Sequence, residues 1–90
     1  MTTLAEMQKR MEKLKDWALE GNKIVKDLEF KDFKQALEFV NKVGEIAEKM
    51  NHHPDIMIFF NAVRLILTTH EAKGLTEKDF DLAEEIDKIN

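Results

Sequence analysis

The sequence predicts an α+β fold, in which a four-stranded antiparallel sheet carries three helices on one face in the order α-β-β-α-β-β-α. Segments with apolar residues at three- and four-residue steps predict the helices. Two intervening segments with the alternation and turn residues of hairpins predict the strands. Three helical stripes need one shared apolar surface, which one face of such a sheet supplies. A chain of 90 residues has room for a single domain, residues 1–90.

The first helix is expected over about residues 4–15. Thr3 is a good N-cap, and Glu6 three residues later completes a capping box. The apolar positions that follow at helical spacing are Leu4, Met7, Met11, Leu14 and Ala18. A β-hairpin over residues 17–30 is expected next, because Gly21-Asn22 tolerates positive φ and apolar residues alternate imperfectly with polar ones after it.

A long helix is expected to follow, from the N-cap Asp32, with Gln35 at its N3 position, to Met50. It ends before Asn51-His52-His53-Pro54, because Pro54 disfavours helical geometry at His53. One apolar stripe is expected to cover the sheet, and it comprises Phe33, Ala36, Leu37, Val40, Val43, Gly44, Ala47 and Met50, with Phe39 and Ile46 beside it.

Residues 55–71 predict a second pair of antiparallel strands, because they are β-branched and aromatic with a break near Asn61-Ala62. The final helix is expected to begin after the N-cap Thr76 and to run to the end of the chain, with Asp79 as its N3 acid. In the second strand of the pair, the core row would be Val63, Leu65 and Leu67, and the opposite row Arg64, Ile66, Thr68 and His70.

The sheet face opposite the helices is expected to be open to solvent, a ligand or a partner. His70 would lie on that face, because it shares strand parity with Thr68. If the hairpin turns near Asn61-Ala62, His52, His53 and His70 gather at one edge of the open face. Since imidazole is the side chain that changes charge near neutral pH, such a cluster is suited to acid–base chemistry.

Two acids are candidates to orient these imidazoles. Glu48 precedes His52 by one helical turn, and Asp79 could act beside its capping role, since a helix N-terminus can hold an acid near a site. Simpler interpretations also stand: histidines at a helix end complement its dipole, and Glu48 suits a solvated helix face. A zinc site formed by the three histidines is a further alternative, but adjacent residues in extended backbone point in opposite directions, so no metal is expected.

Composition excludes several classes of function. The 18 acidic residues outnumber the 14 basic ones, and the formal charge of −4 opposes nucleic-acid binding. No segment approaches the roughly 18 apolar residues of a membrane span. The N-terminal residues lack the features of a signal peptide, and the absence of cysteine fits a cytoplasmic location.

The residues around the histidines form a longer pattern. Glu48-Lys49-Met50-Asn51-His52-His53-Pro54 is followed by Phe60-Asn61, Thr68-Thr69-His70-Glu71, Gly74-Leu75-Thr76 and Asp79. This pattern resembles the pterin-4a-carbinolamine dehydratase family over about residues 14–88. The resemblance implies dehydration of a 4a-hydroxytetrahydropterin to the quinonoid dihydropterin and water, without a cofactor. That reaction recycles the tetrahydrobiopterin-type cofactor of aromatic amino acid hydroxylases, whose pathway would supply the substrate.

The resemblance also implies a role for each candidate residue. His52 and His70 would transfer protons, and His53 would mainly bind and position the pterin. Glu48 and Asp79 would orient the imidazoles. The pterin-contacting positions would be Asn51, His52, His53, Thr68, Thr69, His70 and Glu71.

Two other functions are compatible with the same pattern. One is a related pterin enzyme in molybdopterin cofactor metabolism. The other is a protein-binding role, as in family members that bind transcription factors through the helical surface. A homodimer or homotetramer is expected in any case, because the free edges of a four-stranded sheet favour strand pairing between copies.

Overall fold

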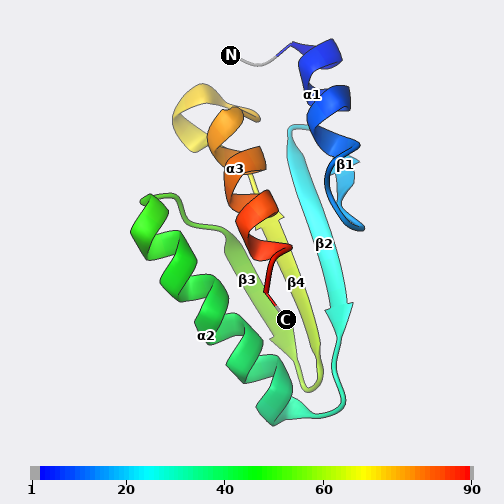
Figure 1. Cartoon of the computed structure of the whole chain (residues 1–90), viewed down its shortest axis with the longest axis vertical. Coiled ribbons are helices and arrows are strands. Elements are labelled where there is room, and N and C mark those ends of the chain that lie inside the picture. The colour runs from blue at the N-terminus through cyan, green and yellow to red at the C-terminus, as the bar shows by residue number, and fades with distance from the viewer. Residues whose placement is uncertain (1–2, 90) are drawn as a thin grey trace.

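The computed structural model describes residues 3–89, and these residues have the predicted order α-β-β-α-β-β-α (Figure 1). The predicted α+β fold class is confirmed. None of the helices within residues 3–89 combines the length and apolarity that a membrane crossing requires. The elements are α1 (Leu4–Met11), β1 (Ala18–Glu20), β2 (Lys23–Glu29), α2 (Phe33–Met50), β3 (Asp55–Phe59), β4 (Ala62–Leu67), the 3₁₀ helix η1 (His70–Ala72) and α3 (Glu77–Ile86).

The four strands form one antiparallel sheet in the order β1-β2-β4-β3. The expected turn at Gly21 is present, with φ of 62° at this residue. The predicted register of β4 is confirmed, because its inward row is almost completely buried (Val63, Leu65 and Leu67). Ile24 of β2, which pairs with Leu67, is buried on the same side. β1 and β3 are therefore the two edge strands, and among residues 3–89 each of them pairs along one edge only.

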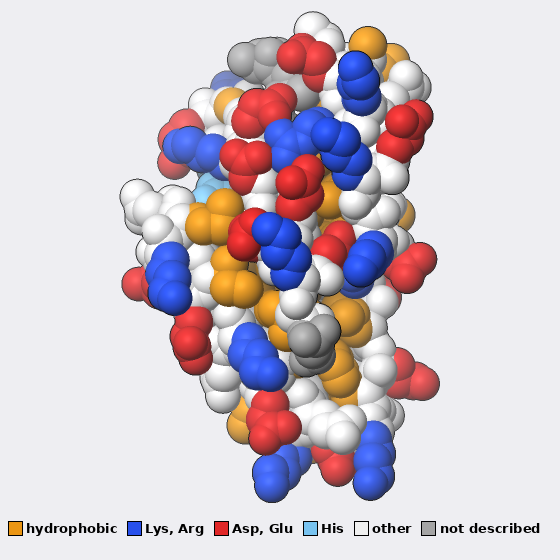
Figure 2. All heavy atoms as spheres, in the orientation of Figure 1, with side chains coloured by type: hydrophobic (Ala, Val, Ile, Leu, Met, Phe, Trp, Pro, Cys, Tyr) orange, Lys and Arg blue, Asp and Glu red, His pale blue; other side chains and the backbone are white. Residues whose placement is uncertain are grey.

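All three helices pack against the same side of the sheet, because their inward residues join one core cluster with the inward rows of the strands. From α2 the buried residues are Ala36, Phe39, Val43 and Ala47, and from α3 they include Phe80, Leu82, Ala83 and Ile86. Figure 2 shows acidic and basic side chains interspersed over this helical face, with apolar side chains between them.

The predicted stripe of α2 needs correction. Phe33 and Leu37 are 48% and 40% exposed, whereas Phe39, which was expected beside the stripe, is buried in the core. At 3.6 residues per turn, positions 36, 39, 43 and 47 lie along one line of the helix, and Phe33 and Leu37 lie along a neighbouring line. The apolar face is wider than the contact with the sheet, so part of it stays exposed.

Both terminal helices are shorter than predicted. α1 ends at Met11 and not near residue 15, because the chain turns over residues 12–16 and reaches φ of 61° at Asp16. α3 ends at Ile86 and does not run to the end of the chain, whose last residue lies outside the described range. The carboxylate of Asp87, the C-cap residue of α3, accepts hydrogen bonds from the Lys15 amide (2.9 Å), Trp17 Nε1 (2.9 Å) and Lys26 Nζ (2.7 Å).

Arg10 of α1 forms hydrogen bonds and ion pairs with acidic residues of α3. The Arg10 guanidinium donates to Glu77, to Asp81 (2.8 Å) and to Glu84 (2.9 Å), and it lies 5.5 Å from the centre of the Phe80 ring. Burial by itself would lower the pKa of Arg10, but the hydrogen bonds to Asp81, Glu84 and Glu77 outweigh it and raise this pKa. α1 has no fully buried residue, so this ion-pair cluster is a main attachment of the helix.

Candidate active site

The end of α2 positions the two adjacent histidines. Asn51 follows the helix in the left-handed conformation, with φ of 52°, and its amide donates to the carbonyls of Ala47 and Glu48. Asparagine tolerates this conformation better than most residues, so the helix stops here and the chain changes direction. His52 and His53 therefore lie in the short segment between α2 and β3.

His70 reaches the same region by a different route from the predicted one. β4 ends at Leu67, and His70 begins the 3₁₀ helix η1, so the prediction that it continues the strand on the open face is wrong. The reason is a backbone pair between Thr69 and Gly74, with N···O distances of 3.0 and 3.3 Å, which closes residues 70–73 into a tight loop. This loop, and not strand parity, places His70.

The three histidines line one cavity of about 480 Å³, a size suited to a small heterocyclic ligand. The residues that line it are Asn51, His52, His53, Thr68, His70, Glu71 and Lys78. Lys78 was not anticipated from the sequence. The sequence feature that could have indicated a role for Lys78 is its position in the first turn of α3, where the helix dipole disfavours a positive charge.

His52 is held by a buried acid. Its Nε2 atom lies 2.6 Å from Oδ1 of Asp79, whose side chain has no exposed surface, while the His52 side chain is 12% exposed. The other oxygen of Asp79 accepts from Thr69 Oγ1 (2.8 Å) and from the Thr76 amide (3.0 Å). Since an ionised carboxylate only accepts, His52 donates through Nε2–H and its Nδ1 atom is left for another partner.

His53 has a much more exposed partner. Its Nε2 atom is hydrogen-bonded to Oε2 of Glu48, but the side chains are 56% and 77% exposed. An ion pair in so much water contributes little to holding either side chain. The two acids proposed from the sequence therefore contact different histidines, Asp79 contacting His52 and Glu48 contacting His53.

Thr68 and Thr69 differ in their position relative to the cavity. Thr68 lines it, and its hydroxyl donates to the carbonyl of Asn22 at 2.7 Å, so only the oxygen lone pairs are left for a ligand. Thr69 was expected to contact the ligand, but it is 5% exposed and does not line the cavity. Its hydroxyl donates to Asp79, so this group is engaged in the free protein, and a direct contact with the ligand stays a prediction.

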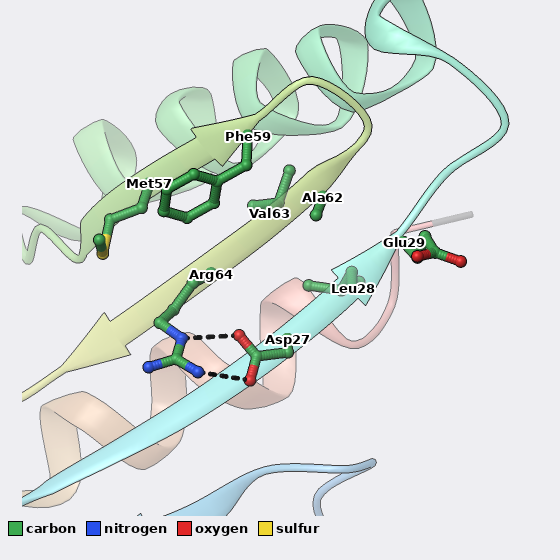
Figure 3. Close-up of a pocket in the computed structure, with 8 residues that line it drawn as sticks. All are labelled: Asp27, Leu28, Glu29, Met57, Phe59, Ala62, Val63 and Arg64. Carbon is green, nitrogen blue, oxygen red and sulfur yellow. Dashed lines mark hydrogen bonds and ion pairs between the residues drawn. The ribbon is translucent and has the colours of Figure 1, made fainter.

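A second hollow, of about 470 Å³, lies on the open face of the sheet (Figure 3). Met57 and Phe59 of β3 form one side, and Arg64 of β4 donates two hydrogen bonds to Asp27 of β2, at 2.8 and 3.0 Å. Hydrogen bonding to Asp27 raises the pKa of Arg64. Because these charges satisfy each other and no histidine lines this hollow, the histidine cavity is the better candidate for acid–base chemistry.

No group of three or more His, Cys, Asp or Glu side chains within residues 3–89 has a geometry that could hold a metal ion. Every buried side-chain nitrogen or oxygen in this range also has a hydrogen-bond partner.

Comparisons with known proteins give one family. The family profile described as "Pterin 4 alpha carbinolamine dehydratase" matches residues 1–89. A curated relative from Trichormus variabilis, provisionally named pterin-4-alpha-carbinolamine dehydratase, is 54% identical over 86 residues, which cover 96% of this chain and 92% of the relative. A relative of the same provisional name from Sulfurisphaera tokodaii is 48% identical over 87 residues, covering 97% and 94%.

Two solved structures are also similar. A "transcriptional coactivator/pterin dehydratase" from Brucella melitensis superposes with a TM-score of 0.87 at 34% identity, over 93% of this chain and 92% of that one. A pterin dehydratase-like protein, identified as a RuBisCO assembly factor in the alpha-carboxysome, has a TM-score of 0.69 at 20% identity, over 81% and 87%. The second likeness concerns the fold alone.

Proposed function

Because the chain belongs to the pterin 4 alpha carbinolamine dehydratase family, we propose that its histidine cavity dehydrates a 4a-hydroxytetrahydropterin to the quinonoid dihydropterin and water. The observation that carries this proposal is the arrangement of His52. Its Nε2 atom is engaged by the buried Asp79, and the same residue lines a polar cavity together with His53 and His70.

The reaction needs one proton donor and one proton acceptor. The substrate loses a hydroxyl group from C4a and a proton from a ring nitrogen, and the protonated hydroxyl leaves as water. His52 is suited to be the acceptor, because Asp79 leaves Nδ1 with its lone pair and stabilises the imidazolium that forms. His70, which is exposed, is suited to be the donor, since solvent can return its proton. General acid–base catalysis of this kind contributes about 10²–10⁴-fold.

The remaining residues of the cavity would bind the pterin. His53 lies beside His52 and is exposed, so it can contact and position the ring. Asn51, Thr68, Glu71 and Lys78 offer donors and acceptors to the polar edge of a pterin. Glu48 and Asp79 stay outside the cavity lining and act through His53 and His52.

The test is dehydration of a synthetic 4a-hydroxytetrahydropterin, followed by absorbance. The wild type is compared with His52→Ala, His70→Ala and the double variant, and circular dichroism checks that each is folded. We expect each single variant to be slower and the double variant to fall to the rate in buffer. A folded wild type with no rate above buffer would contradict the proposal and favour a different pterin or a binding role.

We also propose that the chain associates with copies of itself. Most of the large apolar side chains that are exposed within residues 3–89 lie on β3, on the turn after it and on the outer line of α2: Met57, Phe59, Phe60, Phe33 and Leu37.

β3 is an edge strand without proline or lysine, which are usual protections of free edges. Phe60 also has φ of 51°, which is uncommon for a bulky residue. Pairing of two β3 edges would place Met57 and Phe59 beside the strand of the partner copy.

A further inference from the structure

Thr69 occupies the point where the polar groups behind the histidine cavity meet. Its Oγ1 atom lies 2.8 Å from Oδ2 of Asp79 and 2.8 Å from Oγ1 of Thr76. Thr69 is 5% exposed and Asp79 has no exposed surface, so water competes little for the hydrogen bond between these two side chains. A buried hydroxyl with two partners at these distances is fixed in orientation as well as in place.

The number of protons on these groups fixes which group donates in each hydrogen bond. Asp79 as a carboxylate only accepts, so Thr69 donates its single hydroxyl proton to Oδ2. The Thr76 hydroxyl must then donate to Thr69. The Thr76 amide also donates to Oδ2, at 3.0 Å, and His52 Nε2 donates to Oδ1. Each oxygen of Asp79 is thereby assigned to its own donors, and the oxygen that faces His52 has no other hydrogen-bonding partner among the described residues.

The backbone of Thr69 connects this chain to His70. The amide and carbonyl of Thr69 pair with Gly74 and close the loop in which His70 is the next residue. Its side chain holds the acid that contacts His52. Thr69 therefore links the two histidines to which the proposed function gives the proton transfers, although its side chain does not line the cavity.

We propose that Thr69 is a positioning residue, whose hydroxyl clamps Asp79 so that the carboxylate holds His52 with Nδ1 free for the substrate. The effect on turnover rests on the proposed dehydration, whereas the clamp itself is a property of the free protein. The hydroxyl holds the carboxylate from the side away from His52. Without it, only the Thr76 amide holds Oδ2, and the 2.6 Å contact between Oδ1 and His52 is enforced less strongly.

Two substitutions separate the hydroxyl from the rest of the side chain. Thr69→Val keeps the shape and removes the donor, and Thr69→Ser keeps the donor and removes a methyl group. The first measurement is the proton NMR spectrum of the free protein, in which a short imidazole–carboxylate hydrogen bond gives a downfield, exchange-protected signal. We expect the His52 signal, assigned with His52→Ala, to be present in the wild type and in Thr69→Ser and to be lost in Thr69→Val. Thr68→Val is the matched control and should retain it, because the Thr68 hydroxyl bonds to Asn22.

The second measurement is steady-state kinetics of the dehydration. We expect Thr69→Val to lower kcat by about tenfold to a hundredfold, by analogy with removal of the outer hydrogen-bond partners of metal-bound histidines, with little change in KM. Thr69→Ser should recover most of the rate. A higher KM with unchanged kcat would show that Thr69 contacts the pterin and would overturn the proposal.

The proposal and the proposed function can fail separately. An unchanged His52 signal in folded Thr69→Val would overturn the clamp, whatever the activity. An inactive wild type that shows the expected signals would overturn only the dehydration. If Thr69→Val does not fold, the wild type still provides a test. The hydroxyl proton of Thr69 should be protected from exchange with solvent, because it is held by Asp79. Rapid exchange of this proton would overturn the proposal.

Discussion

His52 Nε2 lies 2.6 Å from a buried oxygen of Asp79, although the two residues are 27 positions apart in the chain. His52 follows the C-terminus of α2, and Asp79 lies in the first turn of α3, so packing of the two helices on one sheet brings them together. The same carboxylate binds the N-cap residue of α3, which means that helix formation and orientation of the imidazole depend on one side chain.

Asp79→Asn should slow the proposed dehydration far more than Glu48→Gln. An amide at position 79 cannot stabilise an imidazolium, and we expect a loss of about tenfold to a hundredfold in kcat. Glu48 contacts His53 in an exposed pair, whose removal should change the rate by only a few-fold. The measurement is kcat and KM for both folded variants. Equal effects would show that burial of Asp79 does not matter for the reaction.

Lys26→Met should destabilise the fold through Asp87. Their side chains are only 11% and 8% exposed, and the substitution leaves a buried carboxylate without its cation. We expect a loss of about 3 kcal/mol in the free energy of unfolding, near the low end for a broken buried pair, since Trp17 and the Lys15 amide still donate to Asp87. Denaturant unfolding measures this loss.

The matched control for that pair is Lys88→Met. Lys88 pairs with Glu85 in the last turn of α3, but both side chains are well exposed. Its removal should change the unfolding midpoint far less than Lys26→Met does. The double variant Lys26→Met, Asp87→Asn should recover part of the stability, because it removes both charges and keeps an acceptor for Trp17 and the Lys15 amide. A double variant as unstable as Lys26→Met would show that the loss has another cause.

The capping box of α1 should respond to acid. The backbone amide and the side chain of Thr3 donate hydrogen bonds to Glu6 and lower the pKa of this carboxyl from 4.5. The folded state therefore favours the charged carboxylate of Glu6. The stability that this carboxylate contributes is fully present above pH 4.5, its ordinary pKa, and is lost as the pH falls through the lower pKa of the folded state. NMR titration of Glu6 should show the lowered midpoint, and Thr3→Val should return it only part of the way toward the ordinary value, because the substitution removes the side-chain donor and keeps the backbone amide. A midpoint that Thr3→Val leaves unchanged would exclude the side-chain hydrogen bond as a cause.

Phe59→Lys should weaken the proposed self-association. Phe59 lies on the edge strand β3 and is 57% exposed, and a charge there opposes close pairing of two edges. Leu4→Lys is the matched control, because Leu4 is 60% exposed but lies on α1, away from that edge. Sedimentation equilibrium should give an oligomer for the wild type and the control and a smaller species for Phe59→Lys. A monomeric wild type at high concentration would exclude the association.

Arg10→Gln should loosen α1 without unfolding the sheet. The guanidinium carries the hydrogen bonds to Glu77, Asp81 and Glu84, and a neutral amide cannot replace its charge or its several donors. We expect the amides of α1 to exchange faster with deuterium, while those of β2 and β4 keep their protection. Equal exchange of α1 in both proteins would mean that its apolar contacts suffice.

Features set by neighbours three or four residues apart were predictable. The caps formed by Thr3 with Glu6 and by Asp32 with the Gln35 amide are present where the sequence places them, as is the turn at Gly21. Their partners lie in the same short segment, so no knowledge of the rest of the fold is needed. The inward row of β4 followed in the same way from the two-residue period of a strand.

Features that depend on contacts between distant segments were not predictable in this way. The exposure of Phe33 and Leu37 depends on which line of α2 meets the sheet, and the place of His70 depends on the Thr69–Gly74 pair that ends β4. Lys78 reaches the cavity only because α3 begins beside the α2–β3 segment. Of these, only Lys78 has a signal within its own segment, its place in the first turn of α3, and that signal does not indicate which cavity it reaches.

The sequence by itself determined the order of the elements, the inward row of β4 and the candidate histidines, because periodicity, caps and motif spacing are local properties of the chain. Only the tertiary structure decided that Asp79 holds His52, that Glu48 contacts His53, and that Thr69 lies behind the cavity and not in it. The reason is physical: a side chain's partner and its burial depend on how separate helices and strands pack, and residues 52, 69 and 79 become neighbours only when α2, β4 and α3 share one core.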